Sequence, residues 1–354
     1  RTILSWYQQW SGRVGNLDTI CHDIQGLSCT SSGAVCVKSL PSAIPPINTI
    51  NGLVRYTAWA IKSILLAGVD IFRGRWWHAL LLNQAAKSAH VRIMSADLLA
   101  REYMFHNANW IYRPLWTYEA EARECLVTFY FYSTNCESFK LRSGYPKQIY
   151  GWQNLNWPRY LVWDEYQSSF VKRVVGEGAS VKVVGSIWFS DGRNDFSPTT
   201  KHNIAVFDVT PQRLSYQAPQ VIQEFHYYTS EVCNQFLLDI QQTSFEQQYN
   251  MLLKQKRKIG SIAHPSYRLL CESLLSLQNV RCVDADTSAI QVIEECDLVI
   301  SMPFTSTALI AREMNKPSVY YDPLGLCQKD DRAAHGIEIL QGKNELESWI
   351  LAQG

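Results

Sequence analysis

Three successive hydroxyl side chains lie where a helix is predicted to begin: Thr305, Ser306 and Thr307. The apolar run 298–302 before them predicts a buried strand, Pro303 and Phe304 turn the chain, and 308–314 predicts the helix. Hydroxyl groups and free N–H groups at a helix start can hold an anion such as phosphate, aided by the helix dipole. This turn is therefore a candidate phosphate site, with an ordinary N-cap as the alternative.

A second candidate anion site is His264-Pro265, which lies 42 residues before Ser306. Proline suits the first position of a helix, so His264 is expected to lie on the capping side with its imidazole near the helix start. Four cations come shortly before it, after a predicted strand: Lys254, Lys256, Arg257 and Lys258. This combination predicts a second anion-binding corner. A solvated basic face with a histidine that only caps the helix is the alternative.

Predicted strands and helices alternate regularly through the second half of the chain. The predicted strands are 203–209, 250–254, 280–283, 298–302, 318–321 and 337–340. The predicted helices are 231–241, 266–277, 289–295, 308–314 and 345–351. Such alternation is typical of a parallel, doubly wound sheet. Both candidate helix starts then lie at the carboxyl edge of one sheet, where ligands bind in folds of this kind.

The first half is less regular. Residues 1–50 are not assigned, and 51–109 is predicted to be helical. Strands are predicted at 126–132, 160–163 and 181–184, with a helix at 164–174. The polar stretch 190–202 predicts a linker. The chain is therefore expected to be an α/β protein with two Rossmann-like domains, 1–192 and 200–354, whose parallel sheets face a central cleft.

The composition narrows the function classes. Lys and Arg number 33 against 32 Asp and Glu, and the absence of a basic tail argues against a nucleic-acid partner. Ten cysteines without CxxC spacing predict buried free thiols in a reducing cytoplasm rather than a zinc site or a disulfide framework. The chain has neither a Walker loop nor a GxGxxG sequence, which argues against P-loop and dinucleotide enzymes.

The two candidate anion sites together resemble B-type (GT-B) glycosyltransferases of bacterial capsule, O-antigen, lipopolysaccharide and other surface polysaccharide synthesis. His264-Pro265 and the Ser/Thr group Thr305, Ser306 and Thr307 are similar in type and spacing to motifs of sialyl- and Kdo-type transferases that use CMP-activated sugars. CDP-glycerol-type polymerases have a similar His-Pro arrangement. The resemblance covers about residues 200–350 and extends weakly to 160–189.

The resemblance implies transfer of a nonulosonic acid or Kdo-like sugar from a CMP donor, inverting and without a required metal or other cofactor. Domain 200–354 would bind the donor and 1–192 the acceptor, a glycan or lipid-linked oligosaccharide. The expected donor-binding residues are Lys254, Lys256, His264, Pro265, Thr305, Ser306, Thr307 and Asp322, with His264 also assisting departure of CMP. The alternatives are a UDP-, GDP- or CDP-linked donor, or a non-catalytic polysaccharide-assembly protein.

One motif of those sialyltransferases is missing: the chain has no pair of acidic residues followed by glycine. An inverting transfer needs a carboxylate or histidine near the acceptor hydroxyl to accept its proton. Glu119, among aromatic residues and shortly before a predicted strand, is the expected base. Further candidates are Glu121, Asp164, Glu165 and Asp191, although Asp164 is better explained as a helix cap.

The apolar stretch 56–72 is interrupted by Lys62 and Asp70 and is too short to cross a bilayer, which needs about 20 apolar residues. We expect a buried amphipathic helix here. With Arg55, Lys62, Arg73 and Arg75 around it, peripheral contact with an anionic membrane is the alternative, which would place a cytoplasmic protein at the inner face of the cytoplasmic membrane.

Overall fold

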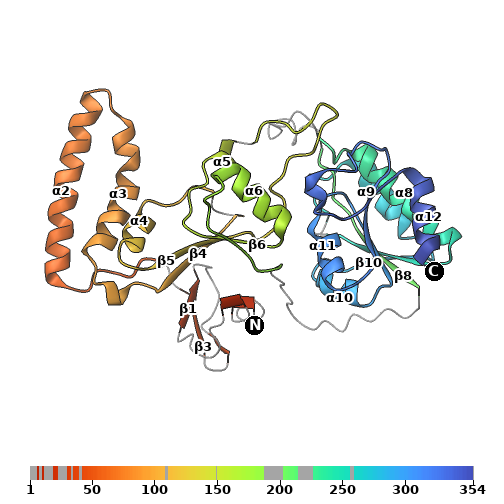
Figure 1. Ribbon diagram of the computed structural model, residues 1–354, viewed down its shortest axis with the longest axis horizontal. Coiled ribbons are helices and arrows are strands. Elements are labelled where there is room, and N and C mark those ends of the chain that lie inside the picture. Colours follow the sequence, from red (N-terminus) through yellow and green to blue (C-terminus); the bar gives the residue numbers. More distant parts are fainter. Residues whose placement is uncertain are drawn as a thin grey trace. The chain divides into compact units, whose positions relative to one another are not determined.

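The computed structural model describes residues 6–7, 10–11, 19–22, 30–32, 35–39, 42–107, 111–148, 150–186, 202–213, 226–255 and 259–353. Its internal contacts divide the chain into two units (Figure 1). The first contains Arg1–Tyr132 and Ile149–Ile187; the second contains Ser133–Gln148 and Trp188–Gly354. Segment Ser133–Gln148 thus belongs to the second unit, although the first unit continues after it. The domain ranges 1–192 and 200–354 stay a prediction.

The second unit is built on a six-stranded sheet with the order β10-β9-β8-β11-β12-β13. Its strands are β8 (Asn203–Phe207), β9 (Asn250–Lys254), β10 (Val280–Val283), β11 (Leu298–Ser301), β12 (Ser318–Asp322) and β13 (Ile339–Gln341). Every neighbouring pair is parallel. The predicted α/β class with a parallel sheet is confirmed. Because β9 and β10 extend the sheet from β8 in one direction and β11 to β13 in the other, the strand order reverses between β8 and β11.

Helices cover both faces of this sheet: α8 (Ser230–Glu246), α9 (Pro265–Leu274), α10 (Ala289–Glu294), α11 (Ser306–Glu313) and α12 (Gly342–Gln353). Ile204 and Val206 point into the core that contains α8, α9 and α12. Ala205 and Phe207 alternate with them and pack in the core that contains α10. Figure 1 shows α8 and α12 on one side of the strands and α10 and α11 on the other.

The first unit contains a four-stranded parallel sheet with the order β4-β5-β6-β7. Its elements are β4 (Glu102–His106), α4 (Trp116–Glu121), β5 (Leu126–Tyr130), α5 (Tyr150–Gln153), β6 (Tyr160–Val162), α6 (Glu165–Val175) and β7 (Val181–Val183). The prediction that 51–109 is helical throughout is wrong at β4. Tyr103 and Phe105 are buried there while their neighbours are not, which is the two-residue period of a strand.

A smaller sheet precedes these elements, in the part of the chain that the sequence left unassigned. It consists of β1 (Thr19–His22), β2 (Thr30–Ser32) and β3 (Val35–Ser39). Strand β3 pairs in parallel with β1 and in antiparallel with β2.

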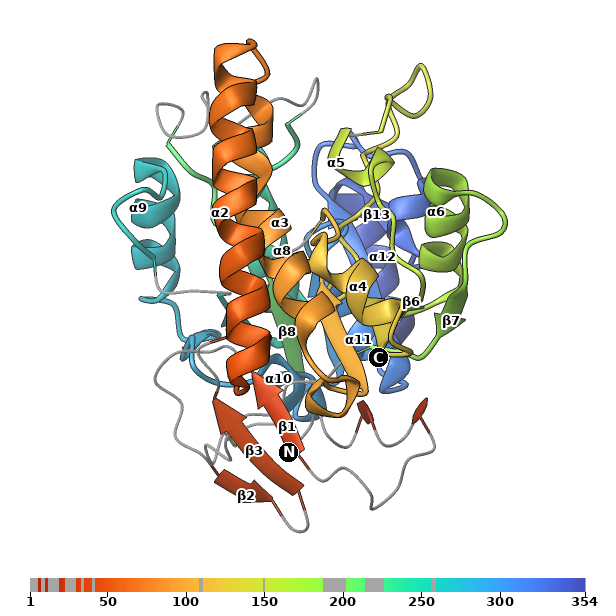
Figure 2. The same ribbon diagram turned by 90° about the vertical axis from the view of Figure 1, so that its left-hand side faces the viewer.

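Two long helices, α2 (Ile50–Phe72) and α3 (Trp77–Ile93), form a helical hairpin followed by the short helix η1 (Ala96–Leu98). They run side by side in both views (Figures 1 and 2). Thr49 caps α2 by accepting the Gly52 N–H. The expectation that α2 is buried is wrong, because Gly52 and Ala67 are its buried residues and its large apolar side chains are exposed. No described helix is both long and apolar enough to cross a membrane.

Candidate functional site

Three strands of the six-stranded sheet end at the same level. Phe207 of β8 is paired with Lys254 of β9 on one side and with Ser301 of β11 on the other. The residues that follow these three strand ends, Asp208, Gln255 and Met302, therefore lie along one carboxyl edge. This edge includes the point where the strand order reverses, the usual ligand position in an open α/β sheet.

The hydroxyl turn lies at this edge, between β11 and α11. Thr305 occupies the N-cap position, but its side chain does not accept a helix N–H. Its Oγ1 donates to the Met302 carbonyl at 2.8 Å instead and lies 3.2 Å from Thr307 Oγ1. Thr307 Oγ1 is also 2.9 Å from Ser301 Oγ. Thr305 therefore does not act as an ordinary N-cap. The first N–H groups of α11 receive no hydrogen bond from its side chain and can still bind an anion.

Phe304, just before these hydroxyls, has a left-handed backbone with φ 64°. A bulky residue in this region is unusual and strained unless its surroundings hold it. Its ring packs 4.7 Å from that of Phe139 and 5.8 Å from that of Tyr320. The carbonyl groups on either side of Phe304 are bound as well, Pro303 O by Tyr228 at 2.8 Å and Thr305 O by Tyr320 at 2.7 Å. The turn is therefore held in one conformation by side chains packed around it.

His264 and Pro265 start helix α9 at the same edge of the sheet. His264 is the N-cap and Pro265 the first helical residue, as predicted. The Nδ1 atom of His264 accepts the Ser266 N–H at 3.4 Å and lies 2.8 Å from Ser266 Oγ. Because Nδ1 accepts, the proton of the neutral ring is on Nε2, which is then a donor for a ligand. The His264 N–H binds the Pro211 carbonyl at 2.8 Å, which joins this loop to the one after β8.

The two helix starts thus flank the loop that follows β8. Among the described residues, no hydrogen bond joins His264 to the hydroxyl turn. Their proximity follows from the strand order, because β9 and β11 are the two neighbours of β8.

Lys254 is buried, unlike a lysine on a solvated basic face. Its Nζ donates to the carbonyls of Gln255 and Ala285, each at 2.9 Å, and burial lowers its pKa. Two of its three N–H donors therefore hold the ends of β9 and β10 together. Lys256 lies outside the described residues. A cavity of about 440 Å³ opens at the same two strand ends, lined by Gln255, Ile259, Cys282, Val283, Asp284 and Ala285.

Asp208 is a carboxyl group at this edge that the sequence did not single out. It follows β8 directly and is buried. The Tyr267 hydroxyl donates to Oδ2, while Oδ1 has no hydrogen-bond partner among the described residues. Burial raises the pKa of Asp208 to about 6. The available signal was an acidic residue near the carboxyl end of the predicted strand 203–209, next to the reversal of strand order.

Asp322, predicted to bind the donor, is fully buried at the end of β12. Oδ1 accepts the Tyr227 hydroxyl at 2.9 Å and the Leu324 N–H at 3.3 Å, and Oδ2 accepts the Cys327 N–H at 2.6 Å. Both oxygens are therefore used to hold the turn 323–327. These are the contacts of a residue that stabilises a turn.

Of the carboxylates expected to act as the base, Glu119, Glu121, Asp164 and Glu165 lie in the first unit. Glu119, on α4, forms an ion pair with Arg92, whose Nε is 3.1 Å from Oε1, and this hydrogen bond lowers the pKa of Glu119. Glu121 pairs with Arg113, and Asp164 caps α6 by accepting the Gln167 N–H at 3.0 Å. Asp191 lies outside the described residues. A lowered pKa and an arginine partner are unfavourable for a general base.

His106 is a further candidate at the carboxyl edge of the first sheet. It ends strand β4 opposite Tyr130 of β5, and its ring lies 5.5 Å from that of Tyr130 and 6.0 Å from that of Tyr132. The sequence did not point to it because the helical prediction for 51–109 concealed β4. Residues at the carboxyl ends of parallel strands are well placed for ligand chemistry.

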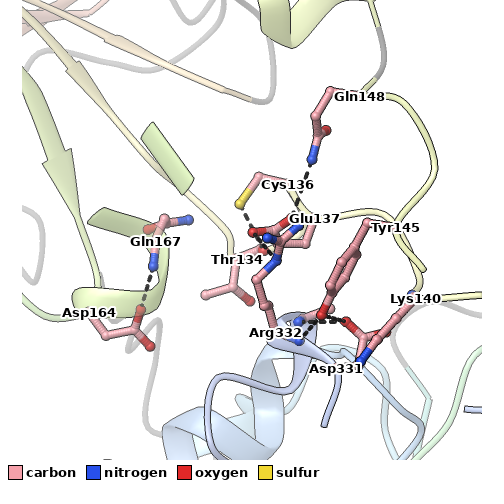
Figure 3. A network of polar contacts seen from close by, with 11 residues as sticks. Thr134, Cys136, Glu137, Lys140, Tyr145, Gln148, Asp164, Gln167, Asp331 and Arg332 are labelled. Atoms are coloured by element: carbon pink, nitrogen blue, oxygen red, sulfur yellow. Dashed lines mark hydrogen bonds and ion pairs between the residues drawn. The ribbon is translucent and has the colours of Figure 1, made fainter. Parts of the chain in front are cut away.

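The segment Ser133–Gln148 packs on the second unit beside the hydroxyl turn; we call it the strap. Lys140 N donates to Asp331 Oδ2 at 2.7 Å, and the Tyr145 hydroxyl donates to Asp331 Oδ1 at 3.2 Å while it accepts the Arg332 N–H at 2.6 Å. Glu137 lies 3.5 Å from Arg332, whose guanidinium stacks 3.6 Å from the Tyr145 ring. Figure 3 shows these residues converging from the strap and the helix η2 (Arg332–Ala334).

No group of three or more His, Cys, Asp or Glu side chains in the described part of the chain is arranged to hold a metal ion. Seven cysteines are free thiols: Cys125, Cys136, Cys233, Cys271, Cys282, Cys296 and Cys327. All of these except Cys282 are buried.

Comparison with known proteins assigns this chain to a family. A model described as "Polysaccharide biosynthesis PFTS motif protein" matches residues 59–350. The four letters of that motif occur here as Pro303-Phe304-Thr305-Ser306, in the turn before α11. No curated protein matches the chain in sequence.

Solved structures similar to this chain include three with 11–12% identity. The glycotransferase of kitacinnamycin has a TM-score of 0.41 at 11% identity, with 77% of this chain and 72% of that chain covered. The wall teichoic acid polymerase TagF, H444N variant, has 0.39 at 12% identity, with 87% and 90% covered. The E. coli heptosyltransferase WaaC with ADP has 0.34 at 12% identity, with 81% and 82% covered.

Proposed function

Because the chain belongs to the family of polysaccharide biosynthesis PFTS motif proteins, we propose that it is a glycosyltransferase acting on a growing surface glycan. In this proposal a nucleotide-activated sugar binds at the carboxyl edge of the six-stranded sheet. The observation that carries the proposal is the hydroxyl turn with its residues Pro303-Phe304-Thr305-Ser306, called the PFTS turn from here on. This turn leaves the start of α11 without a side-chain cap at the reversal of strand order. An uncapped helix start in this position suits the phosphate of a nucleotide sugar.

Two groups would bind the donor phosphate. The first N–H groups of α11 and the Ser306 hydroxyl come from one side of the β8 loop, and the Nε2–H of His264 from the other. Preorganised donors of this kind stabilise the negative charge that develops on a leaving phosphate. Lys254 would act indirectly, by holding the ends of β9 and β10 in place.

The reaction is a substitution at the anomeric carbon of the donor sugar. The acceptor hydroxyl oxygen forms the new bond, and the bond from the anomeric carbon to the phosphate oxygen breaks. The nucleotide leaves with that electron pair, while a base accepts the acceptor proton. The donors at the starts of α9 and α11 lower the barrier by binding the phosphate more strongly as its charge grows.

We propose a CMP-linked nonulosonic acid or Kdo-like sugar as the donor, on the resemblance of the His-Pro and Ser/Thr segments to those of CMP-sugar transferases. A UDP-, GDP- or CDP-linked donor on the same edge is the second candidate. Thermal unfolding with CMP, CDP, UDP or GDP added separately distinguishes them. We expect CMP alone to raise Tm, by a few degrees when its concentration is about 100 times Kd.

Two substitutions and a matched control test the position of the nucleotide. His264→Ala and Ser306→Ala should each weaken nucleotide binding about fivefold to a hundredfold, because each removes a hydrogen bond to a charged group. Ser276→Ala removes a hydroxyl beyond the other end of α9, where Ser276 Oγ binds the Ser273 carbonyl, and should leave binding unchanged. A response to UDP or GDP only would favour the second donor class. No response to any nucleotide would favour a non-catalytic assembly protein.

We propose His106 as the base ahead of Glu119, because Glu119 is neutralised by Arg92 and has a lowered pKa. His106→Gln should lower kcat at least about a hundredfold without changing the nucleotide Kd. Glu119→Gln should change kcat less than about threefold, in keeping with an exposed ion pair that contributes little. Sugar transfer, measured with the donor class that thermal unfolding identifies, decides between them. A large loss in Glu119→Gln with none in His106→Gln would reverse the assignment.

A further inference from the structure

The helical hairpin of α2 and α3 exposes large apolar side chains along most of α2 and at its tip, and a contiguous apolar surface of this kind marks an interaction site. Along α2 the exposed large apolar residues are Ile50, Leu53, Val54, Ile61, Ile64, Leu65, Leu66, Val69, Ile71 and Phe72. Around the turn into α3 they continue with Trp76, Trp77, Leu80 and Leu81. Phe72 is 94% exposed and Leu80 69%. Phe72 ends α2 and Leu80 lies in the first turn of α3, so both are near the tip of the hairpin. The tip lies away from the four-stranded sheet of the same unit (Figure 1).

The exposed residues of α2 form an ordered surface. At about 100° per residue, Val54, Ile61, Leu65 and Phe72 lie on the side opposite the buried Gly52 and Ala67. All the exposed large apolar residues of α2 except Leu66 lie within an arc of roughly 160°, which is wider than the two-position seam of a coiled coil. The cations Arg55, Lys62 and Arg73 are spaced by seven and eleven residues, about two and three helical turns, and so follow one border of the arc.

The charge of this region identifies the kind of partner. Residues 42–93 contain six cations, Arg55, Lys62, Arg73, Arg75, Lys87 and Arg92, and one acidic residue, Asp70. Arg92 is paired with Glu119 of α4, which leaves five cations against Asp70. Asp70 is already bound, with Oδ2 2.6 Å from His78 Nδ1 and Oδ1 4.0 Å from Arg75. At the base of the hairpin, the lining of a hollow of about 320 Å³ includes Arg55, Arg92 and Arg123.

A second copy of the chain would bring the same excess of positive charge to this surface, and no free carboxylate from the hairpin to pair with it. A layer of anionic groups over an apolar interior would match both the cations and the apolar arc of the hairpin. We propose that the hairpin binds the surface of a bilayer containing anionic phospholipid. This proposal does not depend on the transferase activity.

In this arrangement α2 lies in the plane of the bilayer surface. Its apolar arc enters the boundary between headgroups and acyl chains, and the stems of Arg55, Lys62 and Arg73 follow it while their charged ends reach lipid phosphates. Trp76 and Trp77 at the tip suit the headgroup level, where amphipathic aromatic rings are favoured. Attachment of this kind does not require a helix that crosses the bilayer.

Co-sedimentation of the full chain with vesicles tests the proposal. Vesicles of equal parts phosphatidylcholine and phosphatidylglycerol should bind the protein, and binding should weaken as salt is added. Vesicles of phosphatidylcholine alone should bind it at least about tenfold more weakly, since each cation near an anionic surface is worth roughly a fivefold change in affinity.

Three variants locate the binding surface. The double variant Ile61→Asp, Leu65→Asp should reduce binding at least about tenfold, and Lys62→Glu should reduce it about fivefold or more on anionic vesicles only. Phe245→Asp places the same charge on α8, where Phe245 is 67% exposed, and should bind like the unmodified protein. Circular dichroism checks that each variant is folded.

Two results would overturn the proposal. One is an absence of binding to anionic vesicles, or binding that all three variants share. The other is a stable dimer in sedimentation velocity without vesicles that the Ile61→Asp, Leu65→Asp variant dissociates, because the apolar arc would then be a contact between copies of the chain.

Discussion

Asp208 and Asp322 are buried carboxyl groups at the carboxyl edge of the same sheet, but their surroundings differ. Asp322 accepts hydrogen bonds on both oxygens and holds a turn. Asp208 receives the Tyr267 hydroxyl on one oxygen, and the other has no partner in the described part of the chain. A buried carboxylate without full hydrogen bonding is destabilising, so burial raises the pKa of Asp208 to about 6. Asp208 is therefore a carboxyl group at this edge whose charge changes near pH 6.

The substitution Asp208→Asn tests this difference. The folded pKa of about 6 lies above the reference value of 3.8, so the ionised form is disfavoured in the folded state. The free energy of unfolding should therefore fall as pH rises from 3.8 to about 6, and it should stay lower at higher pH. The asparagine variant lacks this loss and should be more stable than the parent by about 1–3 kcal/mol near pH 7.5.

Urea unfolding at about pH 5 and about pH 7.5 measures the effect for parent and variant. Asp284→Asn, at an exposed position after β10, is the control and should change the free energy of unfolding by less than about 0.5 kcal/mol. A variant that is less stable than the parent at about pH 7.5 would contradict this prediction, because the ionised carboxyl group of Asp208 would then stabilise the fold.

Among the structural elements, the strap supports the PFTS turn. Phe139 stacks 5.3 Å from Tyr227 and packs against Phe304, while Lys140 and Tyr145 bind Asp331. The left-handed backbone of Phe304 is strained in isolation, so these contacts help to select it. A loss of packing at Phe139 should therefore affect both the stability of the second unit and the geometry of the turn.

We expect Phe139→Ala to lower the free energy of unfolding by about 2–3 kcal/mol, toward the lower end for buried aromatic truncations because Phe139 is only partly buried. Phe245→Ala, on an exposed face of α8, should cost less than about 0.5 kcal/mol. Urea unfolding gives both values, and titration of the nucleotide that raises Tm reports on the turn. Equal losses in the two variants would mean that the strap adds no specific support.

The elements of the second unit were largely predictable. The ranges of β9 and β10 agree with the prediction residue for residue, because a short apolar run between two turn signals is typical of a buried strand. Strand β4 was missed because EYMFH follows a long helical pattern without a Gly or Pro boundary. The strap was missed for a different reason: its contacts with Asp331 and Phe304 join residues that are far apart in the sequence, and no local pattern encodes them.

For the molecule as a whole, the sequence predicted two α/β units but not which surfaces stay uncovered. The pattern of α2 is that of an amphipathic helix, and periodicity alone does not say whether a core or another partner covers the apolar arc. The residues of the candidate site were likewise predictable only in part. Residue type and spacing pointed to His264 and the hydroxyl turn, whereas Asp208 and His106 became visible only from the ends of the strands that carry them.

The strap also affects how the protein can be divided into fragments. The chain passes from one unit to the other after Tyr132, after Gln148 and after Ile187, so no single cut separates the two. A fragment that begins near residue 202 contains every strand of the six-stranded sheet, yet it would leave Tyr227 and Phe304 without Phe139 and expose the side of the turn that the strap covers. A recombinant second unit should therefore carry Ser133–Gln148 joined through a flexible linker to its first strand.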